Sequence, residues 1–226
     1  MDVLYAGGSS LLWIEGLSQR AGEGGTVTAL DLDRRRVEES GENLEVADLP
    51  APVRLVAGSV FDPPFGPDTF DLVYSAGLFH EIDVSGESAE EALRILASVV
   101  RPGGRVVTED FVDTVPAVQL EDERLDAELA LASSGRELFG IGRPERLVAL
   151  HEKVLSNVGW RIFAPQAIRH LEKIVLAEEE SATFAVLPAG VGERLRGRRA
   201  ALRERIRGEG YTRPATLYVE GRTRGG

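Results

Sequence analysis

Short apolar runs rich in β-branched residues alternate with longer stretches of helical spacing through the first half of the chain. The runs predict strands at Val3–Ala6, Thr26–Asp31, Val53–Gly58, Phe70–Ser75 and Gly104–Asp110. The stretches between them predict helices at about Ser10–Arg20, Asp33–Ala47 and Ser88–Val100. Continuous apolar strands separated by helices indicate a parallel sheet that is covered on both faces. Right-handed crossovers then give a doubly wound α/β domain.

The alternation is less regular after Asp110. Residues 114–140 predict one or two acidic helices, and residues 166–180 fit either a strand or a helix. The pattern then predicts a helix over Arg143–Val158 that is capped by Gly159, followed by a strand at Trp160–Ala164. An arginine-rich helix is predicted over 190–208, with Leu195, Leu202 and Ile206 on one stripe. A last strand is predicted at Thr216–Glu220.

Composition bounds the class of protein. The 226 residues, 43% of them apolar, suit a single α/β domain over 1–226 with one sizeable core. No run of about 18 apolar residues occurs, so no membrane-spanning helix is predicted. The chain has no cysteine, which excludes disulfides and thiolate metal sites and agrees with our expectation of a cytoplasmic protein.

The formal net charge of −11 argues against general binding of nucleic acid, which requires neutralisation of phosphates. The charge is distributed unevenly. Residues 109–130 hold eight acidic side chains and one arginine, whereas residues 191–226 hold ten arginines and four glutamates. Two interpretations are open at this point: two separately solvated helix faces, or an acidic lid that touches a basic C-terminal segment.

Small or acidic residues follow the first four predicted strands. In an open α/β sheet, ligands bind outside the carboxyl ends of the strands. The turn Ala6-Gly7-Gly8-Ser9-Ser10 allows close approach of a ligand to the backbone and opens a helix. Asp31, 24 positions after Gly7, can accept both hydroxyls of a ribose. Gly58-Ser59-Val60 and Ser75-Ala76-Gly77 follow the next two strands. Each feature alone also fits an ordinary turn or helix cap, but four in register favour a binding edge.

The order VLYAGG, VTALDLD, VRLVAGSVFDPPF, FDLVYSAGLFHEI and RPGGRVVTED resembles the class I S-adenosylmethionine-dependent methyltransferases over about residues 1–112. The most specific matches are D-x-F-D-L-V at Asp68–Val73 and R-P-G-G at Arg101–Gly104. Gly159-Trp160 and Thr216–Arg222 resemble the sixth and the closing strands. The resemblance implies a mostly parallel seven-stranded sheet of order 3-2-1-4-5-7-6 with its last strand antiparallel. Helices would cover both faces, with helical lid or substrate segments at 112–142 and 165–210.

The resemblance implies that the chain binds S-adenosyl-L-methionine. The turn Ala6, Gly7, Gly8 and Ser9, preceded by Tyr5, would lie against the methionine part of the cofactor. Asp31 would hold the ribose hydroxyls and Leu32 would pack on the adenine, with Ser59 and Val60 at the adenine amino edge. Ser75 and Ala76 would approach the methionine moiety, and Leu78 would lie nearby on the substrate side.

The chain departs from the family pattern in the glycine loop. Tyr5 stands where the family carries an acid, while Ser9 and Leu11 replace its second and third glycines. The resemblance also implies a helix before the first strand, which here begins at residue 3. Either an upstream piece is missing, or residues 114–140 and the C-terminal helix cover the site.

Transfer of a methyl group from a sulfonium requires a positioned nucleophile and exclusion of water. A general base assists an oxygen or acidic carbon nucleophile. His80 is the first candidate because it follows the fourth strand and titrates near neutrality; otherwise it packs at a helix start without taking part in chemistry. Glu81, Glu109 and Asp110 also lie near strand ends, whereas we expect structural roles for His151 and His170. A metal-assisted site could use Asp110 and Asp113, but their spacing does not select it, so no metal is predicted.

The sequence therefore predicts a methyltransferase that acts on a small-molecule hydroxyl, amine or activated carbon. A second class remains, a non-catalytic or regulatory protein with a degenerate methyltransferase fold. A nicotinamide dehydrogenase is disfavoured because Leu12 stands where its third glycine would be needed. An RNA methyltransferase is supported only by the basic C-terminal segment. We expect a small-molecule substrate and no membrane partner, with a homodimer left open.

Overall fold

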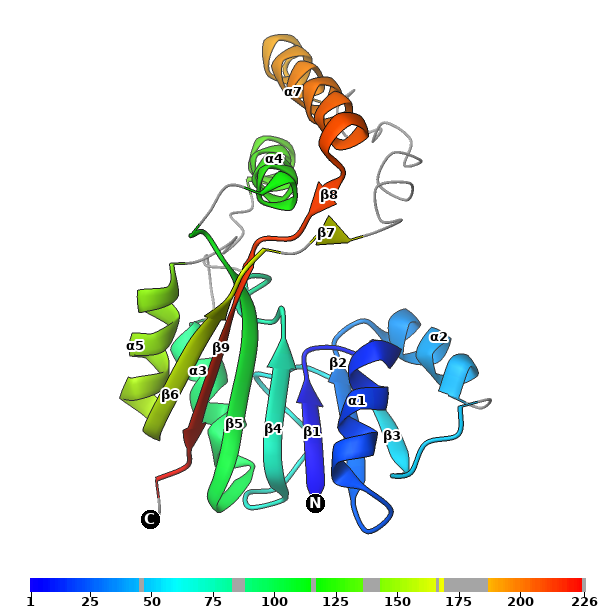
Figure 1. The fold of residues 1–226 in the computed structure, drawn as a ribbon, viewed down its shortest axis with the longest axis vertical. Coiled ribbons are helices and arrows are strands. Elements are labelled where there is room, and N and C mark those ends of the chain that lie inside the picture. Colours follow the sequence, from blue (N-terminus) through cyan, green and yellow to red (C-terminus); the bar gives the residue numbers. More distant parts are fainter. Residues whose placement is uncertain are drawn as a thin grey trace.

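A seven-stranded sheet forms the centre of the computed structural model, which describes residues 1–44, 47–82, 88–114, 117–135, 143–165, 167–168 and 187–224. The strand order is β3-β2-β1-β4-β5-β9-β6 (Figure 1). These strands are β1 (Asp2–Ala6), β2 (Thr26–Asp31), β3 (Val53–Ala57), β4 (Phe70–Ala76), β5 (Val100–Val112), β6 (Ser156–Phe163) and β9 (Ala215–Arg222).

The directions of the strands confirm the predicted topology. Strands β1 to β5 pair in parallel, whereas β9 lies between β5 and β6 and is antiparallel to both. The chain therefore has the doubly wound sheet with an inserted closing strand that the sequence predicted. The carboxyl ends of β1 to β5 meet along one edge.

Helices cover both faces of the sheet. They are α1 (Leu11–Ala21) and α2 (Arg34–Leu44) on one face, with α3 (Ala89–Ser98) and α5 (Pro144–Val154) on the other. Ile14 of α1 packs in one apolar core, while Leu93 of α3 and Leu147 of α5 pack in the second. Each of these side chains is at most 2% exposed, and burial of one such side chain contributes about 1.5–3 kcal/mol. The two cores therefore cover the two faces of the sheet.

The two most specific sequence motifs meet at the amino ends of β1, β4 and β5. The Arg101 guanidinium donates to the Asp71 carboxylate (2.7 Å) and to the Asp2 carboxylate (3.1 Å). The backbone N–H of Asp2 donates to Asp71 at 2.7 Å, and this bond together with Arg101 lowers the pKa of Asp71. A Cβ on Gly104 would lie 2.8 Å from the Asp71 carbonyl oxygen, so the strands approach too closely for any other residue. These motifs therefore hold the strands together at the end opposite the predicted site.

The end of α5 differs from the prediction. The helix ends at Val154, and β6 has already begun at Ser156, so Gly159 is not its cap. Leu155 is extended and only 2% exposed. It packs so closely on β9 that a Cβ on Gly221 would lie 2.8 Å from the Leu155 Cβ. Pairing with β9 thus outweighs the helical pattern of residues 155–158.

Helices α4 (Val118–Ser134) and α7 (Ala189–Glu209) form a separate layer above the carboxyl edge of the sheet (Figure 1). Short strands β7 (Ala167–Ile168) and β8 (Tyr211–Thr212) pair beneath α7. The expectation for residues 166–180 otherwise lies almost wholly outside the described residues. Leu125 of α4 packs with Leu195, Leu202 and Ile206 of α7 in a small apolar core of their own.

Ion pairs link these two helices. Arg199 donates to Asp122 and Asp126, Arg205 to Glu121, and Arg194 and Arg198 to Glu128. The acidic segment therefore touches the basic one, as the second interpretation of the charge pattern expects, while its role as a lid stays a prediction. Within the described part of the chain, no helix is both long and apolar enough to cross a membrane.

Replacing Arg199 with alanine should loosen the α4–α7 layer without unfolding the sheet. Its side chain is only 17% exposed and pairs with Asp122, so the change leaves a poorly solvated carboxylate without its cation. We expect a loss of about 1–3 kcal/mol, seen as faster hydrogen exchange of amides in α4 and α7. Arg207→Ala is the matched control, because Arg207 pairs with Glu204 on an exposed surface and should change stability by less than about 0.5 kcal/mol. Equal effects of both changes would contradict the proposed role of Arg199.

Candidate active site

A cavity of about 240 Å³ opens at the carboxyl ends of β1, β2 and β4. Residues from the glycine turn, from the end of β2, from α2 and from the segment around the end of β4 line it. They are Tyr5, Gly7, Gly8, Ser9, Ser10, Asp31, Arg36, Glu39, Ser40, Ala76 and Glu81. Six of the predicted cofactor residues thus share one cavity: Tyr5, Gly7, Gly8, Ser9, Asp31 and Ala76.

The glycine pair is required by packing. Gly7 has φ +79°, which favours glycine, and the backbone N–H groups of Gly7 and Gly8 both donate to the Leu30 carbonyl oxygen (2.8 and 2.9 Å). A Cβ on Gly8 would lie 2.5 Å from the Tyr5 hydroxyl, and one on Gly7 would lie 2.5 Å from the Leu78 side chain. The turn therefore lies directly over Tyr5, leaving its backbone accessible from the cavity.

Asp31 is held in a fixed orientation at this cavity. Its side chain is 7% exposed, and Oδ2 accepts a hydrogen bond from the Ser9 hydroxyl (2.8 Å). The backbone N–H of Asp33 donates to Oδ1 (2.9 Å), while the Ser40 hydroxyl donates to the Ser9 carbonyl oxygen (2.8 Å). The turn, the end of β2 and helix α2 are thus joined around one carboxylate, an arrangement that fits a ligand with paired hydroxyls.

Five of the predicted cofactor residues do not line this cavity. Ala6 is fully buried and Val60 is 8% exposed, and both pack in the apolar core, whereas Leu32 is 77% exposed. The Ser59 hydroxyl accepts a backbone hydrogen bond two residues further on (3.1 Å). Ser75 is 1% exposed and donates to the neighbouring strand. Their predicted roles in binding remain predictions.

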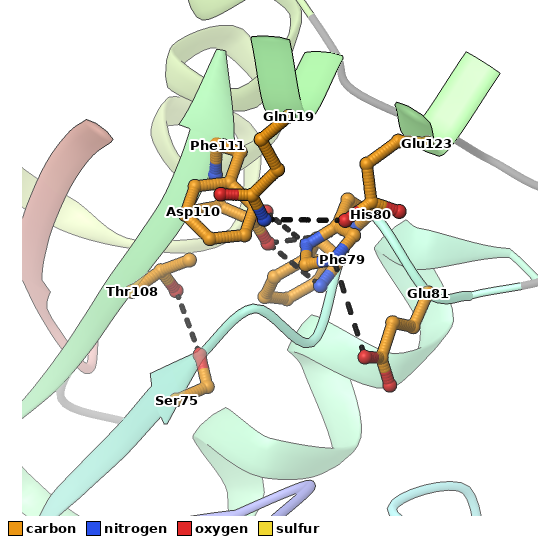
Figure 2. A network of polar contacts seen from close by, with 9 residues as sticks. All are labelled: Ser75, Phe79, His80, Glu81, Thr108, Asp110, Phe111, Gln119 and Glu123. Carbon is orange, nitrogen blue, oxygen red and sulfur yellow. Dashed lines mark hydrogen bonds and ion pairs between the residues drawn. The ribbon is translucent and has the colours of Figure 1, made fainter. Parts of the chain in front are cut away.

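His80 and Asp110 form a buried pair at the same edge of the sheet (Figure 2). His80 Nδ1 lies 2.8 Å from Asp110 Oδ1, and the side chains are 9% and 1% exposed. The backbone N–H groups of Phe79 and His80 donate to Asp110 Oδ2 (2.8 and 3.3 Å). Because the carboxylate accepts from Nδ1, neutral His80 carries its proton there and keeps a lone pair on Nε2.

The surroundings of His80 favour its protonated form. Burial by itself lowers the pKa, but the hydrogen bond to Asp110 and the negative charges of Asp110, Glu81 and Glu123 outweigh it, so the pKa is raised. The Nε2 atom lies 4.0 Å from Glu81 Oε1. Since Glu81 also lines the cavity, the imidazole of His80 lies beside the cavity that the glycine turn borders.

His151 is part of the framework. It is fully buried, with Nδ1 bonded to the Leu147 carbonyl oxygen (2.6 Å) and Nε2 to the Thr108 hydroxyl (2.9 Å). Burial lowers its pKa, so it stays neutral. These contacts agree with the structural role expected for it, while His170 lies outside the described residues.

Sequence reasoning missed the residues that α2 and α4 bring to the site. Gln119 and Glu123 of α4 lie over the His80–Asp110 pair, and Gln119 Nε2 donates to Glu123 Oε1 (3.3 Å) (Figure 2). The acidic pattern of residues 114–140 predicted a helix but gave no indication of which acids face the sheet. Among the residues that the structure describes, no three histidine or acidic side chains are placed to hold a metal ion.

A larger cavity of about 370 Å³ lies elsewhere, between α1 and the face of β4, β5, β6 and β9. Trp13, Tyr74 and Tyr218 contribute aromatic side chains to it, together with Glu109. Neither His80 nor any residue predicted for cofactor binding lines this second cavity, whereas Glu109, one of the further carboxylates near strand ends, does.

Comparison with known proteins agrees with this geometry. Residues 4–108 match the family model described as a methyltransferase domain. The fold is similar to that of a SAM-dependent methyltransferase from Methanosarcina mazei, with TM-score 0.62, 11% identity, and coverage of 100% of this chain and 93% of that one. A SAM-dependent methyltransferase from Aquifex aeolicus gives TM-score 0.55 and 15% identity, with coverage of 99% and 82%.

A third neighbour was solved with a ligand. It is a phospholethanolamine N-methyltransferase 2 from Haemonchus contortus in complex with phosphomonomethylethanolamine and S-adenosylhomocysteine, with TM-score 0.58 and 13% identity. The likeness covers 99% of this chain and 49% of that one. The predicted resemblance is therefore confirmed: the chain has the fold of the class I S-adenosylmethionine-dependent methyltransferases, and residues 4–108 match the model of a methyltransferase domain.

Asp110→Asn should lower the pKa of His80, because burial would then act without the opposing carboxylate. A histidine titration followed by NMR checks this. Asp113→Asn is the control, since Asp113 pairs with Arg124 and should leave His80 unchanged. In the wild type, the raised pKa of His80 means that the pair stabilises the fold fully at a pH below about 6.5, which is the unperturbed pKa of histidine. This contribution to stability is lost as the pH rises through the pKa of His80 in the folded protein. An unshifted pKa of His80 in the asparagine variant would refute the assigned cause.

Proposed function

We propose that this protein transfers a methyl group from S-adenosyl-L-methionine to a small-molecule hydroxyl, amine or activated carbon. The observation that carries the proposal is that the cavity and His80 lie at the same edge of the sheet. There, the cavity bounded by Gly7, Gly8 and Asp31 adjoins the oriented imidazole of His80, with Glu81 common to both. The neighbour solved with S-adenosylhomocysteine has the same fold and supports the choice of cofactor.

The residues of the cavity fit this cofactor. Gly7 and Gly8 line the cavity without a side chain, because Leu78 and Tyr5 occupy the space where a Cβ would lie, so a ligand in the cavity meets their backbone. The buried, oriented Asp31 carboxylate suits the two hydroxyls of a ribose. When bound, the cofactor supplies an electrophilic methyl group on a sulfonium. Tyr5, Gly7, Gly8, Ser9 and Asp31 would hold it.

The His80–Asp110 pair supplies the proton chemistry. Nε2 keeps the lone pair that accepts a proton from the nucleophile, and Asp110 orients the ring and stabilises the imidazolium that results. Helix α4 lies above the pair and limits access of water from that side. His80 therefore acts as the general base, with Asp110 as its positioning residue.

Asp31→Ala should weaken binding of S-adenosylmethionine because the ribose hydroxyls lose their acceptor. We expect a loss of about 1–3 kcal/mol, or roughly 5- to 150-fold in Kd, measured by isothermal titration calorimetry. Asp48→Ala is the control, since this exposed residue precedes β3 at the opposite end of the sheet. An unchanged affinity would exclude Asp31 as the ribose ligand. A folded wild type that binds no cofactor would favour the non-catalytic alternative, for which the departures at Tyr5 and Leu11 give a reason.

His80→Gln should lower kcat by about 10²- to 10⁴-fold while leaving the Kd of the cofactor unchanged, because His80 does not line the cofactor cavity. The assay follows transfer of a radiolabelled methyl group to an accepted small molecule. The wild-type rate should fall at acidic pH as His80 becomes protonated, and Asp110→Asn should move this fall to lower pH. A variant with full activity and an unaltered pH profile would rule out His80 as the base.

A further inference from the structure

Three carboxylates from three different elements surround the His80 ring. Asp110 belongs to β5, Glu81 follows β4, and Glu123 comes from α4 (Figure 2). Burial by itself lowers the pKa of His80, whereas the negative charges of all three carboxylates raise it. Glu123 therefore lies close enough to the ring to interact with it electrostatically. Asp110 is fully engaged by the His80 ring and by three backbone N–H groups. Glu81 and Glu123 remain available to a ligand.

The polar atoms offered to a ligand here are mainly acceptors. Glu81 Oε1 approaches His80 Nε2 only to 4.0 Å, and the Glu81 side chain is 67% exposed. Gln119 donates one N–H to Glu123 Oε1 (3.3 Å), whereas its own Oε1 is fully buried and not accessible to a ligand. The basic residue that lines the cavity is Arg36, which also lies 3.8 Å from Asp33, the residue before its helix. A ligand that satisfies this site must donate hydrogen bonds.

The negative charge of Glu81 and Glu123 also distinguishes the three proposed classes of nucleophile, which are hydroxyl, amine and activated carbon. A phenolate or an enolate would bring a further negative charge beside Glu81 and Glu123, which is unfavourable in a partly desolvated site. An amine has the opposite requirement, since it enters as a cation and its nitrogen is again cationic after methylation. Its N–H groups also match the acceptors.

We infer that the substrate is a small primary or secondary amine, which binds as an ammonium between Glu81 and Glu123 and is methylated on nitrogen. This inference rests on the proposed function and narrows its substrate class. His80 Nε2 first takes one proton from the ammonium, which frees the nitrogen lone pair. The new N–C bond forms as the S–C bond breaks, sulfur leaves as a neutral thioether, and the positive charge passes to nitrogen. The proton on His80 is then released to water.

The test compares three probes of similar shape but different charge at pH 7: benzylamine as the cation, benzyl alcohol as the neutral form and benzoate as the anion. Calorimetry first measures binding of S-adenosylhomocysteine to the wild type, which tests the proposed function separately. NMR titration of the loaded protein then compares the probes. We expect benzylammonium to bind best and benzoate worst, with the largest shifts at His80 and in the first turns of α4.

Glu81→Gln and Glu123→Gln should each weaken benzylammonium binding by about fivefold and should leave benzyl alcohol unaffected. Glu23→Gln is the matched control, because it removes the same charge from an exposed turn between α1 and β2, far from the site. Equal affinity for all three probes, or equal effects of the site and control variants, would overturn the inference. If S-adenosylhomocysteine binds while the cation preference is absent, the proposed function stands and the amine class fails.

Discussion

The parallel pairing of β1 with β2 on one side and β4 on the other is the constraint on which this site depends. The chain leaves the neighbouring strands β1, β2 and β4 at the same edge, so residues distant in sequence converge there. The glycine turn, Asp31 and the segment carrying His80 come from three different strands. The ion-paired network of Asp2, Asp71 and Arg101 joins β1, β4 and β5 at their amino ends, on the side of the sheet opposite the carboxyl edge.

A single buried carboxylate connects stability with chemistry. Asp110 accepts hydrogen bonds from the His80 ring and from the backbone that follows β4, and therefore fixes the position and the tautomer of the imidazole together. Without it, burial would favour a neutral, less basic ring. The same interaction that stabilises the turn after β4 thus keeps Nε2 oriented toward Glu81.

The acidic residues of α4 make contacts on two sides of the helix. Asp122, Asp126 and Glu128 of α4 face the arginines of α7, and these pairs hold the upper layer together. Glu123 lies on the other side of the helix, over His80. Because neighbouring residues on a helix point in different directions, one acidic run can pair with α7 and still place a carboxylate at the site.

The sequence by itself determined the strands of the sheet and the glycine turn, since apolar strands, the motifs around Asp71 and Arg101, and Gly7, Gly8 and Asp31 are local patterns. The strand order followed from the resemblance to the methyltransferase family that these motifs carry. The sequence placed His80 after the carboxyl end of β4, but it could not show whether Asp110 or Glu109 is its partner. Adjacent residues of a strand point to opposite faces of the sheet, and only the pairing of β5 with β4 decides which of the two faces His80. Tertiary structure also decided the early end of α5, where packing of Leu155 on β9 outweighs the helical pattern, and the approach of Gln119 and Glu123. Those contacts join segments that are far apart in the chain, so local sequence patterns cannot predict them.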